Sequence, residues 1–173
     1  MSAKGFWVGQ DGHYALIIPP KSSSAAVAGT RFSLAQYNHA SVILLLGAAG
    51  GPIGAITVNV YAAESGGSGV AIPYRLIKFE NGSAPYDVAS LNSATNNSIF
   101  PETVSGYTPG SQIADSAYIL EIESMDVLAA ANGTYVEVDI AVGSMGTTAQ
   151  LLAGLAVLSG GRNTSDLSPT VQQ

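Results

Sequence analysis

Residues 40–63 read ASVILLLGAAGGPIGAITVNVYAA and contain no charged side chain. The length suffices for a membrane-spanning helix, but turn-forming residues interrupt its middle, at Gly47, Gly50, Gly51, Pro52 and Gly54. Residues 42–46 are all apolar, as in a strand covered on both faces. Residues 56–61 alternate between apolar and polar side chains, as in a strand with one buried face. The sequence therefore predicts a central hairpin of strand, glycine-rich turn and strand, and not a membrane helix.

The composition favours one domain that works in an assembly. The chain has 173 residues, of which 47% are hydrophobic and 10% charged, against roughly 25% charged residues in an average soluble protein. A folded chain with so few charges must cover its surface with small polar residues or bury it against partners, so we expect an assembled state. The net charge of −6 and the lack of a Lys/Arg cluster argue against direct nucleic-acid binding.

The chain has no cysteine, which excludes disulfides and thiolate chemistry. The first twenty residues lack a basic start followed by an apolar run, so we expect no secretion through a signal peptide. Asn-x-Ser/Thr triplets are then more simply turn residues of a β protein, at Asn81, Asn96, Asn132 and Asn163.

Short strand-like segments recur along the chain, at 14–18, 31–34, 70–80, 96–104, 117–123, 134–142 and 150–158. We predict that Pro19 and Pro20 end the first strand and that Pro73 marks a sheet edge or a bulge. Residues 124–131 form the best helix candidate, with Ser124 as its cap and Gly133 as its stop. The sequence predicts an all-β, jelly-roll-like, two-sheet antiparallel β-sandwich with one short helix.

The ends of the chain differ in composition from its middle. We expect a flexible N-terminal arm at residues 1–13, a β-sandwich domain at 14–160 and a flexible, polar C-terminal tail at 161–173. Phe6 and Trp7 lie in the glycine-rich arm. They either form an edge of the core or dock on a neighbouring subunit, because Trp is favoured as an interface anchor.

The usual catalytic constellations are missing from the sequence. His13 and His39 fall in predicted loops with no acid or nucleophile at a diagnostic spacing, so we interpret both as surface residues. Carboxylates also cluster in the predicted strands 117–123 and 134–142. If these two strands pair, Glu121 or Glu123 could approach Glu137 or Asp139, giving a glycosidase pair or a Ca²⁺ site. The simpler interpretation is a solvent-facing set of charges that guards a sheet edge. We expect no catalytic residue, no metal site and no cofactor.

The order of three segments resembles small virion proteins of tailed bacteriophages, of the capsid decoration (cement) type. These segments are GAITVNVYAAESGGSGVAIPYRLIKF (54–79), YILEIESMDVLAAANGTYVEVDIAV (118–142) and AQLLAGLAVLSGGRN (149–163). The match covers roughly residues 38 to 163. The chain departs from the pattern before residue 38 and in the polar tail beyond Arg162.

The resemblance implies a structural protein that binds the major capsid protein of its virion. It would lie on the capsid surface as a homodimer or homotrimer after assembly in the host cytoplasm, without contact to a membrane. From the residues themselves, we expect the partner interface to include Phe6, Trp7, Tyr14 and Arg162.

Two alternatives stay open. The first is a tail- or fibre-associated module that binds a carbohydrate or receptor, with sugar-stacking tyrosines at Tyr74, Tyr86, Tyr107 and Tyr118. The second is a β-sandwich hydrolase that uses Glu121 and Glu137.

Overall fold

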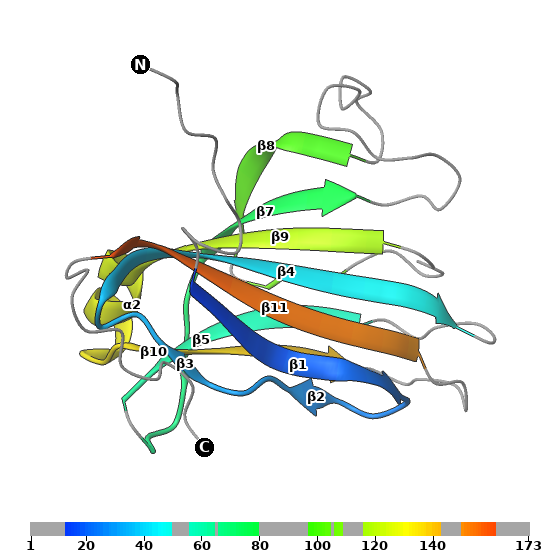
Figure 1. Cartoon of the computed structure of the whole chain (residues 1–173), viewed down its shortest axis with the longest axis horizontal. Coiled ribbons are helices and arrows are strands. Elements are labelled where there is room, and N and C mark those ends of the chain that lie inside the picture. Colours follow the sequence, from blue (N-terminus) through cyan, green and yellow to red (C-terminus); the bar gives the residue numbers. More distant parts are fainter. Residues whose placement is uncertain are drawn as a thin grey trace.

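The computed structural model describes residues 13–49, 56–64, 66–79, 97–104, 106–108, 116–142 and 150–161 (Figure 1). In this part the chain forms two antiparallel sheets and one short helix, which confirms the predicted all-β sandwich. The elements are β1 (His13–Ser23), β2 (Val27–Ala28), β3 (Phe32–Ser33), β4 (Tyr37–Ala49), β5 (Ile56–Ala63), β6 (Val70–Ala71), β7 (Tyr74–Phe79), β8 (Asn97–Val104), β9 (Ser116–Glu123), α2 (Ser124–Ala131), β10 (Tyr135–Val142) and β11 (Gln150–Gly161).

The larger sheet has the strand order β1-β11-β4-β9-β7-β8. The smaller sheet has the order β2-β10-β5-β6, with β3 also paired to β10. One hydrophobic core takes side chains from both sheets, among them Val42 and Leu44 of β4 and Val138 and Ile140 of β10. Alternate residues of these strands point inward because successive side chains of a strand face opposite sides. The predicted alternation in 117–123 and 134–142 is therefore confirmed.

The predicted central hairpin of residues 40–63 is wrong. β4 lies in the six-stranded sheet between β11 and β9, whereas β5 lies in the five-stranded sheet between β10 and β6. Each strand has an apolar face, and Leu44 of β4 and Val58 of β5 are both buried in the same core. Placing the strands in opposite sheets lets these faces cover each other. A hairpin would have left both faces on one side of one sheet.

The prediction that Pro19 and Pro20 end the first strand is also wrong. β1 continues through both prolines to Ser23, and its ladder with β11 shifts register around Ile18 and Lys21. β1 is the edge strand of its sheet. Proline is tolerated there because an edge strand and an irregular ladder do not need every backbone N–H.

Residues 70–80 do not form a single strand, because the chain changes sheets at Pro73. Val70–Ala71 pairs with β5 in the smaller sheet, and Tyr74–Phe79 pairs with β8 and β9 in the larger one. The buried Tyr74 ties the two sheets together, since its hydroxyl donates a hydrogen bond of 2.8 Å to the carbonyl oxygen of Val58.

The helix α2 spans the predicted residues and lies at one end of the sandwich (Figure 1). Its predicted cap is wrong, because the N-cap residue is Glu123, whose side chain makes no capping hydrogen bond. The helix ends at Asn132 in the left-handed conformation (φ 51°). Within the described residues, no helix is long and apolar enough to cross a membrane.

Candidate functional site

The outer face of the six-stranded sheet is apolar across five strands. In register, Leu16 of β1 lies opposite Leu155 of β11, Leu155 opposite Ile43 of β4, Ile43 opposite Ile119 of β9, and Ile119 opposite Ile77 of β7. A second row joins Ala153, Leu45, Ala117 and Phe79. We name as the apolar wall Leu16, Ile43, Leu45, Ile77, Ile119, Leu151, Ala153 and Leu155.

Three leucines of the apolar wall are about half exposed: Leu16 at 52%, Leu45 at 51% and Leu151 at 55%. The other members are partly buried, because their neighbours on adjacent strands shield them. An antiparallel sheet with one face in water ordinarily alternates apolar-in with polar-out. Large contiguous apolar patches on soluble proteins mark interaction sites. The wall is therefore the candidate functional site.

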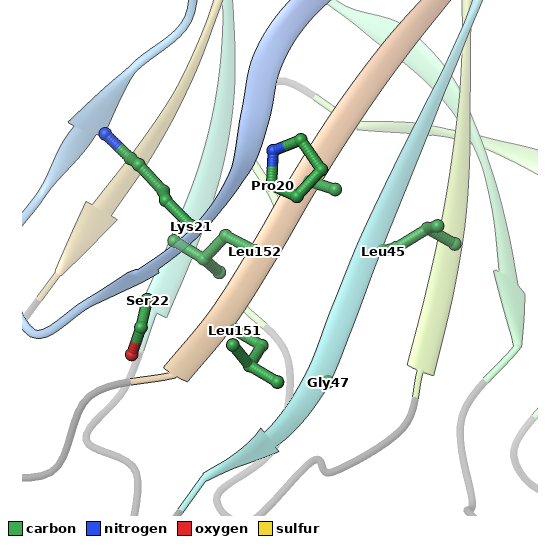
Figure 2. A pocket seen from close by; sticks show the side chains of 8 residues that line it. Pro20, Lys21, Ser22, Leu45, Gly47, Leu151 and Leu152 are labelled. Atoms are coloured by element: carbon green, nitrogen blue, oxygen red, sulfur yellow. The ribbon is translucent and has the colours of Figure 1, made fainter.

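The wall contains a shallow hollow of about 490 Å³ where β1, β11 and β4 run side by side (Figure 2). Small residues leave the space, since Ala153 and Gly47 lie between larger neighbours. A Cβ atom at Gly47 would lie 3.0 Å from the Cβ of Leu151, so glycine allows Leu151 its position. The full lining is Pro20, Lys21, Ser22, Leu45, Gly47, Leu151, Leu152 and Ala153.

A polar cluster borders the wall on the same face. His39 Nε2 lies 2.7 Å from Glu121 Oε2, and the Ser41 hydroxyl donates a 2.7 Å hydrogen bond to the same oxygen. The hydrogen bond to Glu121 raises the pKa of His39, although burial opposes it. Burial acts to raise the pKa of Glu121, but hydrogen bonds from His39 and Ser41 and the charges of His39 and Arg75 lower it. The pair therefore favours the charged imidazolium and the charged carboxylate together.

The structure corrects the interpretation of both histidines, which lie in strands and not in loops. The ring of His13 lies 5.4 Å from that of Tyr37. His39 Nδ1 is 3.3 Å from the hydroxyl of Ser159, so a serine, an imidazole and the carboxylate of Glu121 meet. These are the residue types of a hydrolase triad. However, Ser159 is exposed near the end of β11, where water would surround a reacting carbonyl.

The predicted approach of Glu121 to Glu137 is wrong. β9 and β10 belong to different sheets, and each carboxylate lies on the outer face of its own sheet with the core between them. The pairing failed because α2 connects the two strands across the end of the sandwich, where a turn would have kept them adjacent. No glycosidase pair forms from these two residues.

Glu137 instead forms an ion pair with Arg31, whose Nη1 donates a 2.8 Å hydrogen bond to the carbonyl oxygen of Gly67. Asp139 lies beside them, and burial and the charge of Glu137 raise its pKa to about 6. A small cavity of about 140 Å³ is lined by Arg31, Tyr61, Gly69, Glu137 and Asp139. Among the described residues, no three His, Asp or Glu side chains are grouped to hold a metal ion.

Of the predicted partner-contacting residues, Tyr14 lies half-buried on β1 opposite Val157, next to the wall. Phe6, Trp7 and Arg162 fall outside the described residues. The register that assembles the wall joins strands far apart in sequence, so the sequence pattern did not reveal it. The one signal was the unbroken apolar run 42–46.

Of the predicted sugar-stacking tyrosines, the three that the structure describes do not form a platform. Tyr74 and Tyr118 are 2% and 0% exposed and belong to the core. Tyr107 is half-buried, with its ring 5.7 Å from that of Tyr118 and the Nζ of Lys78 5.0 Å from its centre. Tyr86 lies outside the described residues.

The fold and the site together define an all-β sandwich with an apolar outer wall. No protein-family model matches the sequence, and no curated protein matches it. Among solved structures, the chain is similar to the SPBc2 prophage-derived protein YomS, with 10% sequence identity and a TM-score of 0.47. The match covers 85% of this chain and 93% of that one.

Proposed function

We propose that this protein is a structural virion component, a capsid decoration protein that binds and stabilises the major capsid protein shell of a tailed phage. The observation that carries the proposal is the apolar wall, whose half-exposed Leu16, Leu45 and Leu151 lie on one sheet face. Apolar surface gains roughly 25 cal/mol per Å² when it is removed from water. A face of this kind is suited to adhesion between proteins.

Two features of the sequence support this function. Only 10% of the residues are charged, so burying the surface of this protein against partners removes few charged groups from water. The order of segments between residues 38 and 163 resembles phage decoration proteins. A protein that cements a shell gains affinity when an oligomer engages several shell subunits at once, because the second contact becomes intramolecular.

The test is the protein content of purified virus particles from the source of this sequence. Quantitative mass spectrometry should find the chain at a near-stoichiometric ratio to the major shell protein. Shells stripped of the chain should disassemble at a lower temperature and recover when the purified chain is added back. Absence from the particles would reject the proposal, and a few copies per particle would point to a tail or fibre component.

A further inference from the structure

The apolar wall lacks a covering layer among the described residues. β4 is apolar on both faces, with Val42, Leu44 and Leu46 in the core and Ile43 and Leu45 on the wall. Strands that are apolar on both faces are ordinarily covered on both sides. The sandwich covers only the inner face of β4. Its apolar outer face is therefore expected to be covered by another surface.

We propose that the wall of a second copy of this chain supplies that layer, forming a symmetric dimer through the outer faces of the two six-stranded sheets. The inference rests on the proposed function in one respect: a dimer held together by the wall can engage two shell subunits at once, through surfaces of the sandwich other than the wall. Face-to-face sheets pack about 10 Å apart with interdigitating side chains, as the two sheets within each sandwich do. The dimer would thus be a four-layered stack of sheets.

The wall has the size of a small, reversible interface. Its rows span about seven residues on β1, β11 and β4 but only about three on β9 and β7. With strands about 4.8 Å apart and a rise of about 3.3 Å per residue, the footprint is about 430 Å². Two such faces remove about 860 Å² from water, which is in the range of weak, reversible contacts. Side chains that project from the plane add to this area.

The distribution of charge favours an identical partner. A symmetric interface brings the same patch of both copies together, so a charge at its centre would meet its own copy. The two central rows, from Leu16 to Ile77 and from Ala153 to Phe79, contain no charged residue. Charged residues flank these rows, with Glu121 and Arg75 in the next row and Lys21 on β1 beside the hollow. The net charge of −6 makes copies repel elsewhere, so the neutral wall is where they can approach.

The shape of the wall provides both projections and a recess. Leu45 and Leu151 project from the sheet, and the hollow of about 490 Å³ beside them has Gly47 and Ala153 between its larger side chains. A leucine of the opposing copy fits this recess, whose lining is apolar apart from Lys21 and Ser22. In a symmetric contact, projecting side chains and the recess that receives them must lie on the same face of each copy.

Analytical ultracentrifugation of the full chain tests this dimer, from about 1 to about 100 µM, because association depends on concentration. The wild-type chain should approach twice its 17.5 kDa mass. Leu45→Glu and, independently, Leu151→Glu should shift the midpoint of association by at least about 100-fold, since each buries an unpaired charge. The matched control is Leu128→Glu on α2, where Leu128 is 45% exposed away from the wall, and it should dimerise like the wild type. Circular dichroism and melting curves verify that each variant is folded.

Three outcomes would overturn the inference. The wild-type chain could stay monomeric at about 100 µM, which leaves the wall to a shell protein or to another segment of this chain. It could form a trimer, which a symmetric pair forbids. A dimer that survives both Leu45→Glu and Leu151→Glu would place the contact elsewhere. None of these results alters the copy number in particles, so failure of the dimer and failure of the decoration function remain distinguishable.

Discussion

Leu44 and Leu45 are neighbours in β4, yet Leu44 is fully buried between the sheets and Leu45 is 51% exposed on the outer face. Substitutions at these two leucines therefore distinguish the contribution of the core to folding from the contribution of the outer face to association. Leu44→Ala should lower the free energy of unfolding by about 2–5 kcal/mol, because it leaves a cavity in the core. Leu45→Ala should lower it by less than about 1 kcal/mol in the monomer. Urea unfolding at low protein concentration measures both, and equal losses would contradict the assignment of the two faces.

The contact between His39 and Glu121 predicts a pH-dependent contribution to stability. The pKa of His39 is raised from 6.5, so its contribution is complete below about pH 6.5 and is lost as the pH rises through the folded value. The pKa of Glu121 is lowered from 4.5, so its contribution is present above about pH 4.5 and is lost on further acidification. The ion pair therefore contributes most between these values.

His39→Gln should lower the free energy of unfolding by about 0.5–1 kcal/mol near pH 5.5, because a partly exposed ion pair is lost, and by less near pH 8.5. Glu121→Gln serves as the matched variant. The double variant should lose little more than either single variant, since both remove the same interaction. Additive losses would show that the two side chains do not act on each other.

Replacing Asp139 is expected to stabilise the protein, whereas replacing His39 is expected to destabilise it. Burial and the nearby Glu137 raise the pKa of Asp139 from 3.8 to about 6, so the folded state binds the proton more tightly than the unfolded state. Its contribution to stability is complete below about pH 3.8 and falls as the pH rises through about 6. Asp139→Asn should therefore stabilise the protein near pH 8 by on the order of 1 kcal/mol, after allowance for solvent screening. The gain should shrink towards pH 4.

The free energies of unfolding of Asp139→Asn and of the wild type, compared near pH 8 and near pH 4, measure this effect. Asp126→Asn is the control, because Asp126 lies exposed in the first turn of α2, where a carboxylate favours the helix. That control should give no gain near pH 8. A gain for Asp139→Asn that is independent of pH would show that its charge is not responsible.

Gly133 follows α2 at a point where the chain passes close to the end of β5. A Cβ atom there would lie 2.3 Å from the carbonyl oxygen of Ala63. Gly133→Ala should therefore destabilise the protein by about 2–3 kcal/mol through overpacking against backbone. Gly161→Ala, which meets nothing within 4 Å, should leave the melting temperature nearly unchanged. Equal melting temperatures for the two variants would contradict the close approach.

Local features of the fold could be predicted from the sequence because they depend on neighbouring residues. Val136, Val138 and Ile140 alternate with Glu137 and Asp139, which is sufficient to identify a strand with one buried face. The helix at 124–131 could be placed from Asp126 in its first turn and Gly133 after its end, although its expected cap, Ser124, was wrong. Such patterns need no knowledge of what lies opposite.

Long-range features could not be predicted in this way. The pattern of apolar residues in a strand does not depend on which strand it pairs with. Because β4 and β5 are adjacent in the chain, we predicted a hairpin, but the two strands belong to different sheets. Pro19 and Pro20 are compatible with β1 only because β11 places that strand at an edge. Ile43 meets Leu155 and Ile119 through registers that no local pattern contains. The apolar run 42–46 predicted a strand covered on both faces; in the structure its inner face is buried, and Leu45 on its outer face is 51% exposed.

The most direct test of the covered wall is the reactivity of a thiol placed on it. The chain has no cysteine, so Leu45→Cys and Leu128→Cys each introduce a single reporter. At concentrations where the chain dimerises, the thiol of Leu45→Cys should react with a water-soluble disulfide reagent at least about ten times more slowly than that of Leu128→Cys, and dilution should abolish the difference. Equal reaction rates at every concentration would show that the wall is uncovered, and would contradict the account.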